Sequence, residues 1–441
     1  MDKITFMGAG STVFAKNVIG DSMLTDSLKE FEFALYDIDP QRLEESFIMV
    51  NSLNRVLNDG KAKITKHLGV ENRKEALRGA KFIINAIQVG GYDPCTITDF
   101  EIPNKYGLRQ TIADTLGIGG IFRALRTIPV LEDFAKDIEE VCPDAWFLNY
   151  TNPMGMLTGY MQRYTGVKTI GLCHSVQVCS ELHLLSRLGI EYKKPITENI
   201  VGINHMAWLL ELKDADGRDL YPEVRKRVAE ILDDKDTQFT DLVRYEYIRR
   251  FGYYCTESSW HNAEYNNFFI KSKYPELIDR YKLKLDAYID TCKHHIMKWN
   301  EDRAKYLSDN ITHTKTHEYA ANIMNSIITN TPYTIGGNVI NNGVIPNLPA
   351  EACVEVPCLV NSHGIQPCQQ EPLPPQLAAM NILNINVQLL TIDAAATRKK
   401  ERIYQAAMMD PHTSAELSID DIVSMCDDLI EAHGSWLPKF N

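Results

Sequence analysis

The sequence lacks the features that mark membrane, exported and nucleic-acid-binding proteins. No apolar run reaches the roughly 18 residues of a membrane-spanning helix, and the strand-like residues 3–7 follow Met1 without a signal-peptide pattern. The chain has 46 Lys and Arg and 58 Asp and Glu, which gives a net charge of −12, and it contains no long run of basic residues. We therefore expect a cytoplasmic protein whose partner is neither a membrane nor a nucleic acid.

The cysteines also lack a pattern. Ten of them are scattered without the spacing of a disulfide framework, so reduced thiols are expected and a thiolate is available as a ligand. The chain has 441 residues, 44% apolar and 24% charged, which is the composition of an ordinary folded protein. This length leaves room for a cofactor domain and a substrate domain.

The first half of the chain alternates short apolar runs with amphipathic stretches. This alternation is typical of βαβ units around a parallel sheet. Helices are expected at 41–58 and 121–141. Strands are expected at 4–7, 33–36, 82–86, 146–149 and 169–172. We predict an α/β fold in which residues 1–198 form an N-terminal Rossmann-type domain with a parallel sheet.

The pattern changes from about residue 199. An apolar run to Leu212 precedes helical stretches, then a strand-rich segment with many turn residues, then a helical tail. The helical stretches span 240–250 and 275–305, the strand-rich segment spans 332–370, and the tail spans 375–409. We predict that residues 199–441 form a mixed α+β domain that carries the substrate, the metal and the oligomer contacts.

Gly8-Ala9-Gly10-Ser11-Thr12 follows the first expected strand and precedes a helix. Glycines here let the backbone approach a pyrophosphate, whose charge meets the N–H groups of the helix N-terminus. The third glycine of the usual fingerprint is replaced by Val13, and a tight structural turn is the alternative. We predict that this turn binds NAD through Gly8, Gly10, Ser11 and Thr12.

Asp37 ends the second expected strand. A carboxylate there accepts hydrogen bonds from both ribose hydroxyls and repels the 2′-phosphate of NADP, so Asp37 favours NAD. The alternative is a cap for the turn before Asp39-Pro40.

Polar residues follow several expected strands. Ligands of open α/β sheets bind beyond the carboxyl ends of the strands. The segments concerned are Asn149-Tyr150-Thr151-Asn152-Pro153, Cys173-His174-Ser175 and Gly202-Ile203-Asn204-His205. A lone Cys or His is usually a packed residue, but a Cys and a His that reach one space can hold a divalent ion and leave positions for sugar hydroxyls.

These segments, together with Asp114-Thr115-Leu116-Gly117-Ile118-Gly119-Gly120, occur in the order found in family 4 glycoside hydrolases, and the resemblance covers essentially the whole chain. Downstream segments resemble the bacterial α-galactosidase branch. They are Thr256-Glu257-Ser258-Ser259, Ala263-Glu264-Tyr265, Val354-Glu355-Val356-Pro357 and Ala407-Met408-Met409-Asp410-Pro411-His412. Relatives that cleave 6-phosphoglycosides commonly carry Asp after the metal-binding Cys. His174 at that position favours an unphosphorylated sugar.

The resemblance implies hydrolysis of α-galactosides of the melibiose type by oxidation, elimination, addition and reduction. Hydride passes from C3 of the sugar to NAD, a base removes the acidified C2 proton, and the group at C1 leaves. Water then adds and the hydride returns. Cys173 and His205 are implied as ligands of a divalent ion, with Mn²⁺ as the first choice.

The resemblance also suggests the groups that move protons. Tyr265 is the expected C2 base, and its phenol pKa, near 10 when unperturbed, would be lowered by the metal. Tyr245 and Tyr247 are the alternatives. The acid for the leaving oxygen is Asp114 or His174, and Asp114 has the further alternative of organising the glycine-rich loop.

Asn149 and Asn152 are expected to bind substrate, with nicotinamide as an alternative for Asn152 and a plain turn as its structural alternative. Within the family, α-glucosides and α-galacturonides are alternative substrates, and relatives suggest a homodimer or homotetramer.

Two other functions compete with the glycosidase. A lactate/malate-type dehydrogenase shares such an N-terminal domain but uses an Arg and His pair. Arg123 and Arg126, three residues apart on an expected helix, equally fit a solvated or ion-paired face. A non-catalytic NAD-binding protein would leave the Cys, His and Tyr motifs unexplained.

Overall fold

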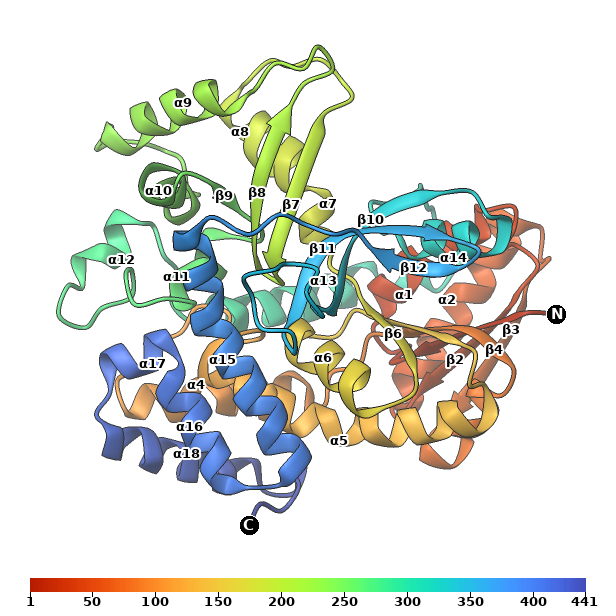
Figure 1. Ribbon diagram of the computed structural model, residues 1–441. Helices are drawn as coiled ribbons and strands as arrows, with labels where there is room; N and C mark the ends of the chain where they lie inside the picture. The colour runs from red at the N-terminus through yellow and green to blue at the C-terminus, as the bar shows by residue number, and fades with distance from the viewer.

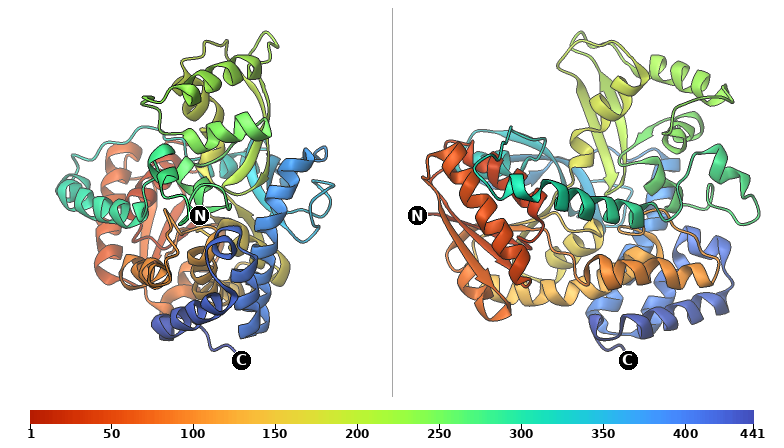
Figure 2. Two further views of the ribbon diagram at one scale, coloured as in Figure 1. Left: turned by 90° about the vertical axis from the view of Figure 1, so that its left-hand side faces the viewer. Right: turned by 180° about the vertical axis from the view of Figure 1, so that it is seen from behind.

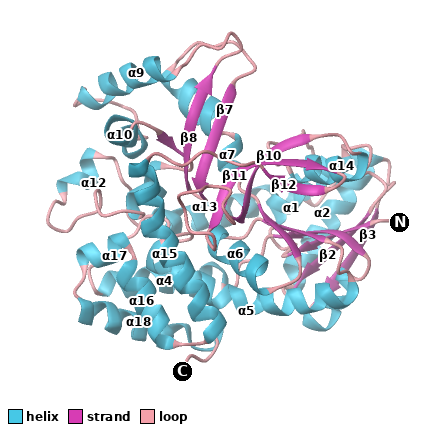
Figure 3. Cartoon of the chain, in the orientation of Figure 1, coloured by secondary structure: helices cyan, strands magenta, loops and turns pink.

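One sheet runs through the whole molecule (Figures 1 and 3). The structure, a computed structural model, describes residues 1–441. It has 12 strands in the order β3-β2-β1-β4-β5-β6-β10-β11-β7-β8-β9, with β12 paired to β11. The strands from β3 to β6 are all parallel, and their order, 3-2-1-4-5-6, is that of the Rossmann fold. The predicted fold class is confirmed.

The parallel strands are β1 (Lys3–Met7), β2 (Glu32–Asp37), β3 (Lys63–Leu68), β4 (Ala80–Asn85), β5 (Trp146–Asn149) and β6 (Lys168–Gly171). The sequence predicted all of them except β3. That strand forms an edge of the sheet and alternates exposed and half-buried residues, so it has no apolar run to identify it.

The connections between these strands cover the sheet. The helices are α1 (Thr12–Met23), α2 (Pro40–Asn58), α3 (Arg73–Leu77), α4 (Ile97–Lys105), α5 (Gly117–Val141) and α6 (Met154–Tyr164). Two short irregular turns, η1 (Val70–Asn72) and η2 (Gly91–Thr96), precede α3 and α4. Helix α5 begins four residues before the predicted start, directly after the loop that carries Asp114.

The remaining strands are antiparallel and extend the same sheet: β7 (Thr197–Ile203), β8 (Met206–Lys213), β9 (Tyr254–Cys255), β10 (Tyr333–Ile340), β11 (Cys353–Asn361) and β12 (Gly364–Pro367). Strand β10 joins β6 at one pair, Asn338 opposite Gly171. Strand β11 joins β7 at one pair, Glu355 opposite Gly202. We call these four residues the seam. Because the sheet and the buried apolar core continue across it, the predicted division at residues 198/199 stays a prediction.

The helices of the second half lie around this extension. They are α7 (His174–Gln177), α8 (Ser186–Leu188), α9 (Tyr221–Asp233), α10 (Leu242–Phe251), α11 (Ser259–Glu264), α12 (Glu276–Arg280), α13 (Ala287–Tyr306), α14 (Ala320–Thr329), α15 (Pro375–Thr397), α16 (Lys400–Met409), α17 (Pro411–Glu416) and α18 (Ile419–His433), with turns η3 (Cys179–Leu185) and η4 (Gly434–Trp436). Seen from behind, α13 reaches across to α2 (Figure 2). Its Trp299 and Arg303 side chains donate hydrogen bonds to Glu45 there.

Helix α15 is long and apolar enough, by length and composition alone, to cross a membrane. However, 61% of its apolar 18-residue stretch is buried inside the protein. It packs against α5, α6 and α16, and a helix in a protein core passes the same test. Its buried Asn381 and Asn384 donate to the backbone carbonyls of Met206 and Tyr265. The C-terminal helices α15 to α18 gather in one lobe (Figure 1).

Candidate active site

The glycine-rich turn lies between β1 and α1. A Cβ at Gly8, where φ is +83°, would lie 2.8 Å from the Ala86 carbonyl oxygen, so this position requires glycine. The Ser11 side chain makes no capping hydrogen bond to α1. The N–H groups of the first helical turn, which begins at Thr12, therefore remain available to an anion. The turn predicted to bind the pyrophosphate thus has the free N–H groups that an anion site needs.

The Asp114 loop is held by a buried glutamate that sequence reasoning did not assign. The Glu264 carboxylate accepts hydrogen bonds from the N–H groups of Thr111 and Ala113, at 2.7 and 2.8 Å. Ala113 has a φ of +56°, a conformation that costs energy in a residue other than glycine. Glu264 thus fixes the loop at the point where it turns Asp114 inward.

Cys173 follows β6, as predicted, and its backbone is held by Tyr319. The Tyr319 hydroxyl accepts from the Cys173 N–H at 2.8 Å and donates to the Cys173 carbonyl at 3.1 Å. The Cys173 Sγ lies 3.4 Å from His205 Nε2 and 3.1 Å from Ser175 Oγ. Burial, with Glu355 and Glu257 nearby, raises the pKa of the thiol. A thiolate at this place therefore needs a compensating positive charge.

His205 occupies the two-residue turn between β7 and β8, with a φ of +63°. The Asn262 side chain donates to the His205 carbonyl at 3.4 Å, which helps to hold this conformation. Burial lowers the pKa of His205, so its imidazole is neutral, the form that ligates metals. The end of β6 and the β7–β8 turn thus bring a thiol and an imidazole together, an arrangement that the family resemblance implied.

A third group, Glu257, completes a set of metal-ligand types. Donor atoms of Cys173, His205 and Glu257 all lie within 4.8 Å of one another, and Glu257 Oε2 is 3.6 Å from His205 Nε2. Glu257 also has a left-handed backbone, with a φ of +68°. Burial opposes its ionisation, but the nearby His261 outweighs burial and lowers the pKa of Glu257 to about 2. Thiol, imidazole and carboxylate are the donors of a divalent transition-metal site.

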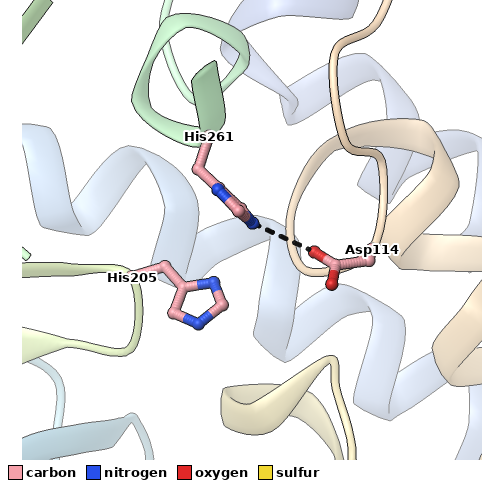
Figure 4. A group of neighbouring side chains, drawn as sticks. All are labelled: Asp114, His205 and His261. Carbon is pink, nitrogen blue, oxygen red and sulfur yellow. Dashed lines mark ion pairs between the residues drawn. The ribbon is translucent and has the colours of Figure 1, made fainter. Parts of the chain in front are cut away.

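His261 lies between the carboxylates of Glu257 and Asp114, and Figure 4 shows its ion pair with Asp114. Its Nε2 is 3.6 Å from Asp114 Oδ1, and its Nδ1 is 3.4 Å from Glu257 Oε1. Burial disfavours a charged imidazole, but Glu257 and Asp114 outweigh it and raise the pKa of His261 to about 9. The imidazolium in turn lowers the pKa of Asp114 against the effect of burial. Asp114 is therefore a carboxylate that accepts hydrogen bonds.

Of the three tyrosines considered as a base, Tyr265 is the one at the site. Its Oη lies 3.4 Å from His205 Nδ1. Tyr247, by contrast, donates to the Asn262 carbonyl and packs among aromatic rings, and Tyr245 packs beside Phe239. Burial, then Asp114, Glu264 and Glu257, raises the pKa of Tyr265 well above its usual value. A nearby cation would act in the opposite direction.

The two candidate asparagines differ in their contacts. Asn149 donates to Thr151 O and Thr158 Oγ1 and accepts from Asn85 and Thr151 N–H, so it would have to give up internal bonds to hold a substrate. Asn152 is half-buried and donates to Asp114 Oδ2 at 3.3 Å. Asn152 therefore lies beside the carboxylate cluster, whereas Asn149 supports the end of β5.

The arginines on α5 have separate environments. Arg126 is fully buried and pairs with both oxygens of Asp99, at 3.0 and 2.6 Å, so it is a structural ion pair. Arg123 donates from Nε to the Asn152 carbonyl at 3.3 Å and lies over the Tyr288 ring. The His174 side chain is exposed at the start of α7, next to Cys173.

The structure brings Cys173, His205 and Tyr265 together, and it adds Glu257, Glu264 and His261, to which the sequence analysis assigned no role. The first two stand in segments whose resemblance had been noted, so a signal existed for them. His261 stands in none, and only the orientation of α11 brings it between the carboxylates.

Comparison with known proteins agrees with this geometry. Residues 3–188 match the family 4 glycosyl hydrolase model, and residues 200–413 match the model of its C-terminal domain. The chain is 59% identical to an α-galactosidase of Bacillus subtilis (strain 168) over 441 residues, 100% of both chains. It is 32% identical to an α-galactosidase of Rhizobium meliloti (strain 1021), covering 99% of this chain and 89% of that one.

A solved structure shares the fold. A 6-phospho-α-glucosidase from gut microorganisms, in complex with NAD and Mn²⁺, superposes with a TM-score of 0.78 at 19% identity, with 100% of each chain covered. Together with the two matching family models, which span nearly the whole sequence, these similarities show that the chain belongs to family 4 of the glycosyl hydrolases.

Proposed function

We propose that the protein hydrolyses unphosphorylated α-galactosides with the help of NAD and a divalent metal ion, Mn²⁺ being the first choice. The observation that carries this proposal is the convergence of Cys173, His205 and Glu257 within 4.8 Å, with the Tyr265 hydroxyl 3.4 Å from His205. The substrate class follows from the 59% identity to an α-galactosidase over the full chain.

The N-terminal turn fits NAD. Gly8 and Gly10 leave no room for side chains, the first turn of α1 has unpaired N–H groups, and Asp37 ends β2 beside the turn. We assign Gly8, Gly10, Ser11 and Thr12 to the pyrophosphate and Asp37 to the adenosine ribose. The fold-related enzyme described above holds NAD, which supports this assignment.

The second group fits a divalent ion. Cys173, His205 and Glu257 would ligate it, and the raised pKa values of the Cys173 thiol and the Tyr265 phenol both call for a positive charge at this place. When bound, the metal acts as a Lewis acid toward the sugar hydroxyls, and NAD accepts and returns a hydride.

The remaining steps are carried by side chains of the protein. Tyr265 Oη takes the proton from C2 of the sugar, and His205 holds the phenol through Nδ1. Asp114 and Asn152 orient the substrate, since the Asp114 carboxylate is ionised and accepts hydrogen bonds. His174, exposed at the site, donates a proton to the leaving oxygen.

One assay tests the function. Release of nitrophenol from a 4-nitrophenyl α-galactoside is expected only with NAD, Mn²⁺ and a thiol reductant, without net NADH. Parallel assays use the 4-nitrophenyl α-glucoside and α-galacturonide. A faster reaction with either of them would show that the proposed substrate class, the α-galactosides, is wrong. Steady accumulation of NADH with a ketone product would instead identify a dehydrogenase.

We further propose that the enzyme works in the cytoplasm as a homodimer or homotetramer. All ten cysteines are free thiols, and a thiol metal ligand needs a reducing compartment. Cell fractionation and light scattering of the purified protein test the two statements separately.

A further inference from the structure

The seam brings a buried carboxylate behind the proposed metal ligands. Glu355 on β11 is completely buried, as are Asn338 and Asn204. Its Oε1 accepts hydrogen bonds from both amides, from Asn338 Nδ2 at 3.0 Å and from Asn204 Nδ2 at 3.3 Å. A single oxygen atom thus joins two segments of the chain.

Each of the two segments leads to one ligand. Asn338 also donates to the carbonyl of Gly171 at 3.3 Å, and Gly171 ends β6 two residues before Cys173. Asn204 is the neighbour of His205 in the β7–β8 turn. In the sheet, the β10–β11 pair lies between β6 and β7. It joins β6 only through the pair Asn338–Gly171 and joins β7 only through the pair Glu355–Gly202. The strands alone therefore tie the two ligand segments together weakly.

We infer that Glu355 is a positioning residue for the metal centre, whose carboxylate sets the separation of Cys173 and His205 by holding Asn338 and Asn204 at once. The inference rests on the proposed metal site. A metal tolerates little variation in ligand distance, so groups that orient its ligands affect affinity almost as strongly as the ligands do.

The unpaired atoms of this cluster make a discriminating substitution available. Glu355 Oε2, Asn204 Oδ1 and Asn338 Oδ1 have no hydrogen-bond partner. Glutamine at 355 keeps the accepting oxygen and replaces the unpaired Oε2 by an N–H donor, in a cluster where the two asparagine Oδ1 atoms lack a donor. Leucine at 355 fills similar space but removes the bridge. A comparison of E355Q with E355L therefore distinguishes an effect of the hydrogen-bonded bridge from an effect of filling the space at position 355.

The experiment measures metal binding directly in the full-length protein. Mn²⁺ affinity comes from the electron paramagnetic resonance signal of free Mn²⁺, and ligand geometry from the thiolate-to-Co²⁺ charge-transfer band of the Co²⁺-loaded protein. We expect E355L to weaken Mn²⁺ binding by about 10- to 100-fold and to shift or weaken the Co²⁺ band, with NAD affinity unchanged. E355Q is expected to retain both signals.

The matched control is N341A. Asn341 follows β10, is completely buried and donates to the carbonyls of Ile345 and Leu348, so its loss lowers stability without touching either ligand segment. If E355L fails to fold, N338A, which cuts one arm of the bridge, is expected to weaken Mn²⁺ binding in the same direction.

Three results would overturn the inference: wild-type Mn²⁺ affinity in E355L or in its substitute N338A, an equal loss in E355Q and E355L, or an equal loss in N341A. Failure of the unmodified protein to bind Mn²⁺ would instead overturn the proposed function.

Discussion

The Asp37 carboxylate accepts a hydrogen bond from the Gly10 N–H, 2.6 Å from nitrogen to oxygen, so the acidic end of β2 and the glycine-rich turn form one unit. Its other oxygen accepts from the Asp39 N–H at 2.9 Å. Arg42 lies beside them, because a Cβ at Gly10 would come within 2.9 Å of the Arg42 Cβ. The Asp37 carboxylate and the stem of the Arg42 side chain therefore lie together at the glycine-rich turn, beside the position proposed for the ribose.

The first prediction concerns cofactor choice. The unmodified enzyme is expected to prefer NAD to NADP by more than about tenfold in kcat/KM, because Asp37 repels a 2′-phosphate. Asp37→Asn removes this charge while Arg42 remains, so the preference should fall. The control, Asp26→Asn, removes the same charge from an exposed ion pair with Lys29 and should leave the preference unchanged. Equal use of both cofactors by the unmodified enzyme would show that Asp37 does not face the ribose.

The second prediction concerns the metal ligands. Cys173→Ser and His205→Ala are each expected to weaken Mn²⁺ binding by more than about 100-fold, beyond the effect of a supporting residue, and Glu257→Gln to weaken it less. NAD affinity should stay unchanged, because the glycine turn is separate. Cys179→Ser, at another buried thiol outside the cluster, is the control. A variant that still bound Mn²⁺ normally would remove that residue from the ligand set.

The third prediction concerns proton removal at C2. Hydrolysis in D₂O should place deuterium at C2 of the released sugar, read by NMR. Tyr265→Phe should lower kcat by about 10²- to 10⁴-fold, the usual contribution of a general base, while keeping the packing of the ring. Because hydride transfer precedes this step, the variant should form NADH from substrate slowly without releasing aglycone. Unlabelled sugar from the unmodified enzyme would refute the elimination, and normal turnover by the variant would exclude Tyr265 as the base.

The fourth prediction concerns pH and the stability of the metal-free protein. The pKa of His261 rises from 6.5 to about 9 on folding, so its imidazolium stabilises the fold below pH 6.5 and this contribution disappears as pH rises through 9. The full contribution corresponds to about 3 kcal/mol. His261→Gln should therefore lower the free energy of unfolding in urea at pH 6 but hardly at pH 9.5. The control, exposed His363→Gln, should have little effect at either pH, and an equal loss by His261→Gln at both would contradict the prediction.

The fifth prediction concerns a buried ion pair. Asp99 binds Arg126 on α5 and His433 at the end of α18, so Asp99→Ala leaves a buried guanidinium unpaired and should cost about 3–5 kcal/mol of unfolding free energy. Glu75→Ala, in the exposed pair with Arg78, should cost less than about 1 kcal/mol. Removing both charges in Asp99→Leu/Arg126→Met should recover part of the loss. Equal effects of the two single substitutions would mean that the buried pair adds no stability.

Much of the parallel half could be predicted because its signals are local. The buried strands are continuous apolar runs, and the expected ends of β4, β5 and β6 lie within a residue or two of the observed ones. The expected helical stretches at 275–305 and 375–409 are interrupted, at Asp286 and Arg398, by backbone with φ values of +56° and +58°. Residues other than glycine rarely adopt a positive φ, and the spacing of apolar residues does not indicate where they do, so these helix ends could not be predicted from the sequence.

The site could be predicted only in part for a similar reason. Cys173 and His205 stand at strand ends, where the topology of open sheets places ligands. His261 and Glu264 reach the cluster because α11 and the 111–113 loop pack against each other, a contact between residues about 150 positions apart. Such long-range packing has no local signal in one sequence.

The seam has a consequence for the order in which the protein is made. Strands β10 and β11, which lie between β6 and β7 in the sheet, are synthesised after both of them. A nascent chain that ends before residue 333 therefore carries an unpaired edge at β6 and an unattached β7–β8 hairpin, and such edges favour association with other chains. If Glu355 sets the separation of Cys173 and His205, the two residues reach it only after the last quarter of the chain, from β10 onward, has been made. We therefore expect metal to bind late in biogenesis, after the strand that bears Glu355 has inserted.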